Sequence, residues 1–182
     1  EKKIIVIPNG VDTNLYRPAG EAEVEGKIVS VGRIEHEKGF DVLIKAIKLV
    51  LKERECSLYI IGFGSKEQEL KKLVSKLGIE LHIKFLGRLP PSEVAKHLQT
   101  CSFFALPSRY ESFGMVYIEA MACGKPVPVD DVNAVAEKIL VLLHDKELRK
   151  KMGGAGRRVA EEKYSWDVIG KKIIKVYEEV LG

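Results

Sequence analysis

Two glutamates in the middle of the chain flank a segment that is otherwise almost apolar. They are Glu111 and Glu119, within RYESFGMVYIEAMACG at residues 109–124. We expect a helix to begin near Phe113 or Gly114, and the first N–H groups of a helix attract anions. A glycine at that point lets a ligand come close to the backbone. The segment therefore predicts an anion-binding site with Glu111 beside it.

A structural interpretation of the same glutamates is also open. Glu111 could complement the helix dipole, and Glu119 could pair with Lys125. This interpretation is weaker for Glu119, because its neighbours Ile118 and Ala120 read as core and a carboxylate there needs specific partners.

A second group of charged residues lies in VGRIEHEKGFD, at residues 31–41. Arg33 and Lys38 fall in an expected loop between a strand and a helix, with a glycine beside each. Two cations next to glycines and a helix start can approach a phosphate. Alternatively, they could pair with Glu35 and Glu37 as solvated surface charges, and spacing alone favours neither interpretation.

Other cofactor motifs are incomplete. IIGFGSKEQ resembles the start of a dinucleotide-binding fingerprint, but Glu67 takes the place of its third glycine, which counts against a nicotinamide dehydrogenase. The sequence contains no P-loop motif. Cys56, Cys101 and Cys123 lie far apart without a CxxC pair, so we expect buried free thiols rather than a zinc site.

Composition narrows the class of protein. The chain has 182 residues, 46% of them hydrophobic, which suffices for one well-buried domain. A net charge of +4 does not imply nucleic acid. The basic run ELRKKMGGAGRR lacks the interleaved aromatics of an RNA-binding stripe. These two observations lead us to expect no nucleic acid as a partner. No apolar run approaches the length of a membrane-spanning helix, so we also expect a cytoplasmic protein.

Short β-rich runs alternate with amphipathic helical patterns along the chain. We expect Gly78 to cap one helix at its C-terminus and Ser92 to cap the next at its N-terminus. The expected strands are 3–8, 27–33, 57–64, 83–87 and 102–108. The expected helices are 40–53, 66–78, 91–101, one from 113 or 114 onward, 133–145, 147–164 and 165–182.

This order predicts an α/β fold, a Rossmann-like parallel sheet with helices on both faces. The nearly continuous apolar strands agree, because parallel strands are buried on both sides. Such folds bind ligands beyond the carboxyl ends of the strands, which is where Arg33, Lys38 and Glu111 fall. We expect residues 1–182 to form a single domain.

Taken together, the motifs resemble the C-terminal, nucleotide-sugar-binding half of the retaining GT-B glycosyltransferases. The similar group, glycosyl transferases group 1, includes glycogen and sucrose synthases and bacterial mannosyltransferases. The matching pieces follow the order of that family: VIPNGVD, VGRIEHEKGFDVLIKA, LYIIGFG, IKFLGRLP, ALPSRYESFGMVYIEAMACGKPV and YSWDVIGKKIIKVYEEVL. The specific part is VGR-x4-KG together with ES-F-G-x4-E-A-x-A-x-G-K-P-V, and the likeness covers almost the whole chain.

The resemblance implies a role for each matching residue. Arg33 and Lys38 would hold the diphosphate of the donor, and Arg88 and Leu89 would lie beside its nucleobase. Together with Glu111, the two cations would be catalytic, because groups that bind the charge developing on the leaving diphosphate lower the barrier.

The resemblance also implies roles for the segment from Glu111 to Glu119. Glu111 would face and position the transferred sugar, and Glu119 would accept hydrogen bonds from the ribose hydroxyls. Retention would follow from same-face attack assisted by the leaving phosphate rather than from Glu111 as a nucleophile. The backbone N–H groups that would contact sugar and phosphate belong to Ser112, Phe113, Gly114, Met115 and Val116.

The resemblance implies no cofactor and no metal. The nucleotide-sugar is a substrate, a UDP-, GDP- or ADP-sugar, and the sequence does not specify its base or sugar. Asp130 and Asp131 precede an expected helix, so we read them as a helix start rather than a metal site.

The sequence departs from the family in two places. After Val127, a strand, a loop, a short helix and a further strand are missing, and we favour a segment omitted from this sequence over a natural deletion. The family's N-terminal domain, which carries the acceptor site, is also missing. The closing helix at 164–182 would cross to that domain. The full-length enzyme would glycosylate a sugar, polysaccharide or lipid, in the cytoplasm or at the inner membrane face, and this chain alone would show little transferase activity.

Two other functions stay open from the sequence. A sugar-nucleotide epimerase has the same fold, but its acid–base residues would lie in the missing half, and the paired glutamates fit transferases better. A non-catalytic nucleotide-sugar-binding module is the second, and the intact set of Arg33, Lys38, Glu111 and Glu119 argues against it.

Overall fold

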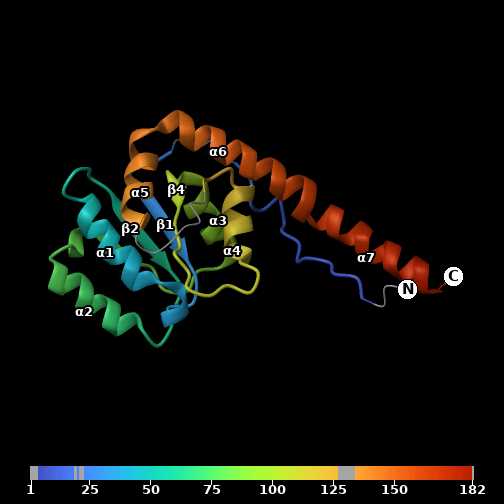
Figure 1. Ribbon diagram of the computed structural model, residues 1–182, viewed down its shortest axis with the longest axis horizontal. Coiled ribbons are helices and arrows are strands. Elements are labelled where there is room, and N and C mark those ends of the chain that lie inside the picture. Colours follow the sequence, from blue (N-terminus) through green and yellow to red (C-terminus); the bar gives the residue numbers. More distant parts are fainter. Residues whose placement is uncertain (1–3, 19, 21–22, 127–133, 182) are drawn as a thin grey trace.

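The computed structural model describes residues 4–18, 20, 23–126 and 134–181 (Figure 1). Its strands form a four-stranded parallel sheet in the order β3-β2-β1-β4, which confirms the expected fold class. The strands are β1 (Lys27–Val31), β2 (Ser57–Ile61), β3 (Ile83–Phe85) and β4 (Phe103–Phe104).

The centre of the sheet is apolar on both faces. Ile28 of β1 lies opposite Leu58 of β2 on one side and Phe103 of β4 on the other. All three side chains are fully buried, as expected for a parallel sheet covered on both faces. β4 is shorter than the expected 102–108, because the chain turns away after Ala105 into the loop that leads to α4.

Helices cover both faces of the sheet. The chain passes from β1 to β2 to β3 in one direction and then returns across the sheet to β4. Right-handed crossovers therefore place α1 and α2 on one face and α3 on the other, and Figure 1 shows the strands between these groups. The helices are α1 (Phe40–Val50), α2 (Glu67–Leu77), α3 (Pro91–Thr100), α4 (Met115–Ala122), α5 (Val135–His144), α6 (Lys146–Val159) and α7 (Trp166–Leu181), with 3-10 turns at His36–Lys38 and Glu80–His82 and a π-helical turn at Ala160–Tyr164.

The two ends of the chain differ most from the rest of the fold. α7 extends away from the body of the molecule, and Ile169 is its buried residue (Figure 1). The expected strand at 3–8 is wrong: residues 4–10 form no strand and lie outside the sheet. They have no neighbouring strand to pair with, and the backbone first pairs at Val11, which bridges to Ser165 before α7.

Local sequence signals predict one helix end well and one poorly. Gly78 ends α2 in the left-handed conformation, with φ of 63°, as expected of a C-cap glycine. Ser92 is not the N-cap of α3, because Pro90 takes that position and Pro91 begins the helix. Proline suits the first helical position, where the N–H group it lacks would have no intrahelical partner. None of the helices in the described ranges is long and apolar enough to cross a membrane.

Candidate functional site

The candidate site lies where the strand order of the sheet reverses. β1 and β4 are neighbours, and the chain leaves them toward opposite sides of the sheet. Loops diverge at such a switch point and leave a crevice. Here the crevice is a cleft of about 300 Å³. It is lined by Asn9, Val31, Gly32, Arg33, Lys38, Glu111, Ser112, Phe113, Gly114, Met115 and Val116.

An ion pair joins the two loops inside this cleft. The Nζ of Lys38 lies 2.7 Å from Oε2 of Glu111, and the side chains are only 14% and 25% exposed. The hydroxyl of Ser108 donates to the same carboxylate oxygen at 3.3 Å. The surface-charge interpretation of Lys38, with Glu35 or Glu37 as its partner, is therefore wrong.

Arg33 is also at the cleft, but in a different environment. Its side chain is 72% exposed and pairs with Glu37 at 3.2 Å, as the surface-charge interpretation proposed. Exposed i,i+4 pairs contribute little free energy, so Arg33 can exchange Glu37 for an anionic ligand at low cost. Glu35 has another role, because its carboxylate accepts hydrogen bonds from the N–H and hydroxyl of Ser65.

A second ion pair holds the same two loops together outside the cleft. The Arg109 guanidinium donates to both carboxylate oxygens of Asp41 at 2.8 Å and to the His36 carbonyl at 2.7 Å. Gly39 lies directly against Pro107, since a Cβ at residue 39 would come 2.0 Å from the Pro107 carbonyl oxygen. Sequence spacing gave no signal for the Arg109–Asp41 pair, because its members are 68 positions apart.

The N-terminus of α4 opens into the cleft. Gly114 is its N-cap, with φ of 79°, and Tyr117 donates the first hydrogen bond of the helix back to the Gly114 carbonyl. The N–H groups of Met115 and Val116 precede that bond and are the ones available to an anion. Both belong to the expected set of Ser112 to Val116, and the helix begins slightly later than predicted.

Glu119 lies further along α4 and is not part of the cleft lining. The Tyr16 hydroxyl donates a hydrogen bond to it, so its partner is Tyr16 instead of Lys125. Burial raises the pKa of Glu119, and the bond from Tyr16 opposes that shift. The predicted contact of Glu119 with a ribose stays a prediction.

A smaller hollow of about 190 Å³ adjoins the cleft at the ends of β1, β2 and β3. Arg88 and Leu89 line it, and it shares Arg33 with the cleft. The Arg88 guanidinium lies 5.6 Å from the centre of the Phe63 ring, which is 54% exposed. Phe63 is a candidate site residue that the sequence reasoning missed, although IIGFG was singled out for its glycines.

One of those glycines explains how the hollow forms. Gly62 has φ of 143°, and a Cβ there would come 1.9 Å from the carbonyl oxygen of Gly32. The N–H of Gly62 also donates to the carbonyl of Gly87 at 2.8 Å. The glycine therefore serves the close approach of neighbouring strand ends.

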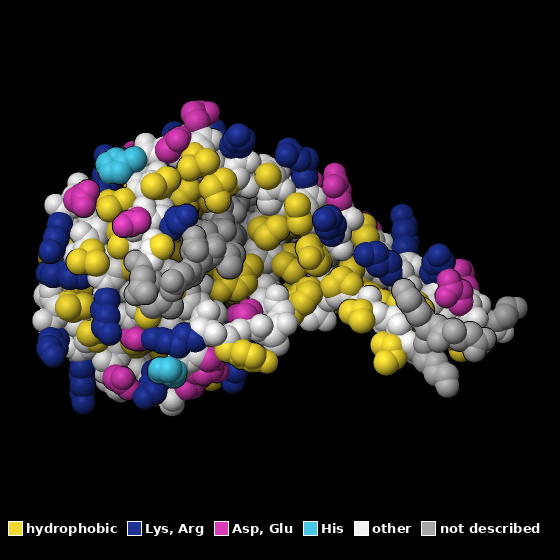
Figure 2. Space-filling view, in the orientation of Figure 1, with side chains coloured by type: hydrophobic (Ala, Val, Ile, Leu, Met, Phe, Trp, Pro, Cys, Tyr) yellow, Lys and Arg dark blue, Asp and Glu magenta, His cyan; other side chains and the backbone are white. Residues whose placement is uncertain are grey.

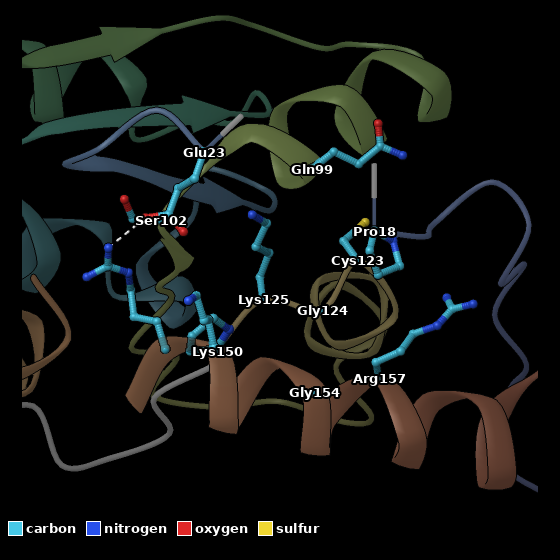
Figure 3. A pocket seen from close by; sticks show the side chains of 12 residues that line it. Pro18, Glu23, Gln99, Ser102, Cys123, Gly124, Lys125, Lys150, Gly154 and Arg157 are labelled. Carbon is cyan, nitrogen blue, oxygen red and sulfur yellow. Dashed lines mark hydrogen bonds and ion pairs between the residues drawn. The ribbon is translucent and has the colours of Figure 1, made fainter. Parts of the chain in front are cut away.

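A third hollow, of about 340 Å³, lies apart from the other two and shares no lining residue with them (Figure 3). Its wall includes Arg149, which is 4% exposed and donates to the Leu142 carbonyl and to Glu23 at 2.6 Å. Arg157 on the same helix donates to the Ala122 carbonyl at 2.7 Å. These arginines bind α6 to the rest of the domain.

Metal ligands do not gather in the described part of the chain, which contains no group of three His, Cys, Asp or Glu able to hold an ion. Asp130 and Asp131, expected to start a helix, lie outside the described residues, as does the junction after Val127. Cys56, Cys101 and Cys123 are buried as expected.

Known proteins resemble this chain in sequence and in fold. The profile of the family described as glycosyl transferases group 1 matches residues 12–131. An uncharacterized glycosyltransferase, MJ1178 of Methanocaldococcus jannaschii, is 34% identical over 99% of this chain and 55% of its own length. A GDP-mannose-dependent monoacylated alpha-(1-6)-phosphatidylinositol monomannoside mannosyltransferase of Corynebacterium glutamicum is 30% identical over 94% of this chain and 55% of its own.

Solved structures show the same fold. The crystal structure of Anabaena HepE in complex with UDP has a TM-score of 0.86 at 21% identity, over 96% of this chain and 57% of HepE. This chain spans about half the length of the curated relatives it matches. The alignment with MJ1178 covers 201 positions, more than the 182 residues here, so MJ1178 has extra residues within the matched region. The chain belongs to the glycosyl transferases group 1 family and has the fold of a GT-B C-terminal domain.

Proposed function

We propose that this chain is the donor-binding half of a retaining hexosyltransferase and holds a nucleoside-diphospho-sugar at the carboxyl ends of its strands. The observation that carries the proposal is the pairing of Lys38 with Glu111 beside the N-terminus of α4. It places a cation, a carboxylate and free N–H groups together at the switch point of the sheet.

The diphosphate would bind between Lys38, Arg33 and the first N–H groups of α4. Transfer breaks the bond between the anomeric carbon and the phosphate oxygen, and the leaving diphosphate takes the negative charge. Cations and a helix N-terminus fixed in place stabilise that charge more as it grows, which lowers the barrier. These groups would do this without a metal ion.

The nucleobase would occupy the 190 Å³ hollow, with Arg88 and Leu89 beside it and Phe63 at its rim. An exposed aromatic ring under a guanidinium offers a flat surface on which a base can stack. HepE was solved with UDP, and the Corynebacterium relative is named for GDP-mannose. Both support a nucleoside diphosphate as the ligand class without selecting the base.

The transferred sugar would lie at Glu111, on the cleft side of the loop formed by residues 108–114. Glu111 would accept hydrogen bonds from sugar hydroxyls and stabilise positive charge at the anomeric carbon. The attacking hydroxyl would approach on the face from which the diphosphate leaves, which gives retention. Glu119 would reach the ribose by exchanging its bond with Tyr16 for bonds to the hydroxyls.

The acceptor would bind in the half of the relatives that this chain does not span. Exposed hydrophobic side chains that this half would cover lie on α7 and the N-terminal segment (Figure 2). In the N-terminal segment these are Ile4, Ile5 and Val6, and on α7 they are Ile173, Ile174, Tyr177, Val180 and Leu181.

Amide NMR during titration tests the donor site. UDP, GDP, ADP and their sugars would be added separately to the ¹⁵N-labelled chain. We expect one of the nucleoside diphosphates to shift the amides of residues 32–38, 63, 87–89 and 111–116 while those of α7 stay in place. No shift in these loops at millimolar ligand would contradict the proposal.

A further inference from the structure

The loops that carry Lys38 and Glu111 are joined by a second set of bonds that does not touch the cleft. Arg109 lies two residues before Glu111, and Asp41 lies three residues after Lys38. Neither lines the cleft or the adjoining hollow. They therefore lie outside the proposed ligand site and close in sequence to both residues that would contact the ligand.

We propose that Arg109 and Asp41 are positioning residues that set the separation of Lys38 and Glu111 in the donor site. This inference rests on the proposed function. It assigns the pair to the geometry of ligand binding rather than to the stability of the domain.

The contacts fix both distance and orientation. Two parallel bonds of 2.8 Å join the Arg109 guanidinium to Asp41, and a third of 2.7 Å joins it to the His36 carbonyl. The backbone N–H of Arg109 donates to the Glu37 carbonyl at 2.7 Å. A planar fork held at several points leaves the loop little freedom to slide or turn.

The position of the pair explains why it acts on the ligand site. Asp41 is in the first turn of α1, so it belongs to a rigid element, whereas Arg109 belongs to a loop. Without the pair, the Glu111 loop would be held to the Lys38 loop by the backbone bond from Arg109 to Glu37, by the packing of Gly39 on Pro107 and by the ion pair that the ligand must open. A displacement of about 1 Å in such a site can lower activity on the order of a hundredfold.

The stabilising effect of the pair on the fold is expected to be small. Both side chains are about 30% exposed, at 29% for Arg109 and 30% for Asp41. Partly exposed ion pairs contribute little to unfolding free energies. Their removal should then change ligand affinity much more than melting temperature, which separates positioning from a structural role.

The test compares the wild-type chain with Asp41→Asn, Arg109→Lys and the double variant. Calorimetry gives the affinity for the best-binding nucleoside diphosphate and for its monophosphate, and thermal melts give stability. A matched control is Glu67→Gln, which removes the exposed pair of Glu67 with Lys71 on α2.

We expect each single variant to weaken diphosphate binding on the order of tenfold, with a smaller loss for the monophosphate and little change in melting temperature. The double variant should be no worse than the weaker-binding single variant, because both break the same interaction. Glu67→Gln should bind like wild type. Unchanged diphosphate affinity, or losses that are equal for both ligands and follow the melting temperature, would overturn the positioning role.

Failure of the donor site itself would be seen separately. If the wild-type chain binds no nucleoside diphosphate, the proposed function fails and the positioning role fails with it. If the wild type binds and loses affinity on Lys38→Ala but not on Asp41→Asn, the donor site stands and only the positioning role is wrong.

Discussion

The ammonium of Lys38 lies 2.7 Å from the carboxylate of Glu111, although 73 residues separate them in the chain. The pair connects the loop after β1 with the loop after β4. It also means that the cation expected to bind phosphate already has a partner, so a diphosphate must compete with Glu111 for Lys38.

Replacing Glu111 by glutamine separates its two proposed effects. Glu111→Gln should raise the affinity for a free nucleoside diphosphate several-fold, because Lys38 no longer loses an ion pair on binding. The preference for the nucleotide-sugar over the nucleotide should fall, because the carboxylate that faces the sugar is gone. Calorimetry with both ligands measures this, with Glu69→Gln on α2 as the control. Weaker binding of the free diphosphate would show that Glu111 does not compete for Lys38.

Gly114 should tolerate no side chain. A Cβ at this residue would lie 2.5 Å from the Tyr117 ring, and the φ of 79° is unfavourable for other residues. Gly114→Ala should cost about 1–3 kcal/mol in unfolding free energy and reduce anion binding at α4. Gly154→Ala in α6 is the matched control, because a Cβ there meets open space and alanine favours helix. Urea unfolding would contradict the prediction if the two variants were equally stable.

Arg149 should contribute to the stability of the fold and not to ligand affinity. Arg149→Met would leave the Leu142 carbonyl without its donor and Glu23 without its cation, at a cost of about 1–3 kcal/mol. The exposed neighbour Lys150, replaced by methionine, should change stability little. Chemical denaturation and nucleotide titration would be done on both variants, and a large loss of affinity in folded Arg149→Met would place the third hollow in the ligand site.

Glu119 should make the domain less stable as pH rises. Burial raises the folded-state pKa of Glu119 above its unfolded value. The stability that goes with its protonated form is therefore present below the unfolded pKa and is lost as pH rises through the folded pKa. Glu119→Gln removes this loss, so its unfolding free energy relative to wild type should increase between acidic and neutral pH. A difference between the two proteins that does not vary with pH would contradict the assignment.

The sequence predicted the sheet because its strands are nearly continuous apolar runs such as KIVSV and SLYII, which only a doubly covered sheet buries. The same criterion failed for IIVI at residues 4–7, because an apolar run has the same sequence pattern whether it is buried in a sheet or exposed at the surface. Ile4 is 80% exposed.

The site was predictable to the extent that each loop has its own chemistry. Arg33, Lys38 and Glu111 were expected at strand ends, and the structure places all three in one cleft. The partner of Lys38 and the Arg109–Asp41 pair were not predictable, because side-chain pairing between loops depends on which strands are adjacent. Spacing along one chain does not specify that adjacency.

The most direct measurement is the affinity of the chain for UDP, GDP and ADP, with and without its two proposed phosphate-binding cations. We expect wild type to bind at least one of them in the submillimolar range, and Arg33→Ala with Lys38→Ala to lower that affinity on the order of tenfold or more. Lys175→Ala on α7 should leave it unchanged. Unaltered affinity in the double variant, or no binding by the folded wild type, would contradict the assignment of this cleft to the donor diphosphate.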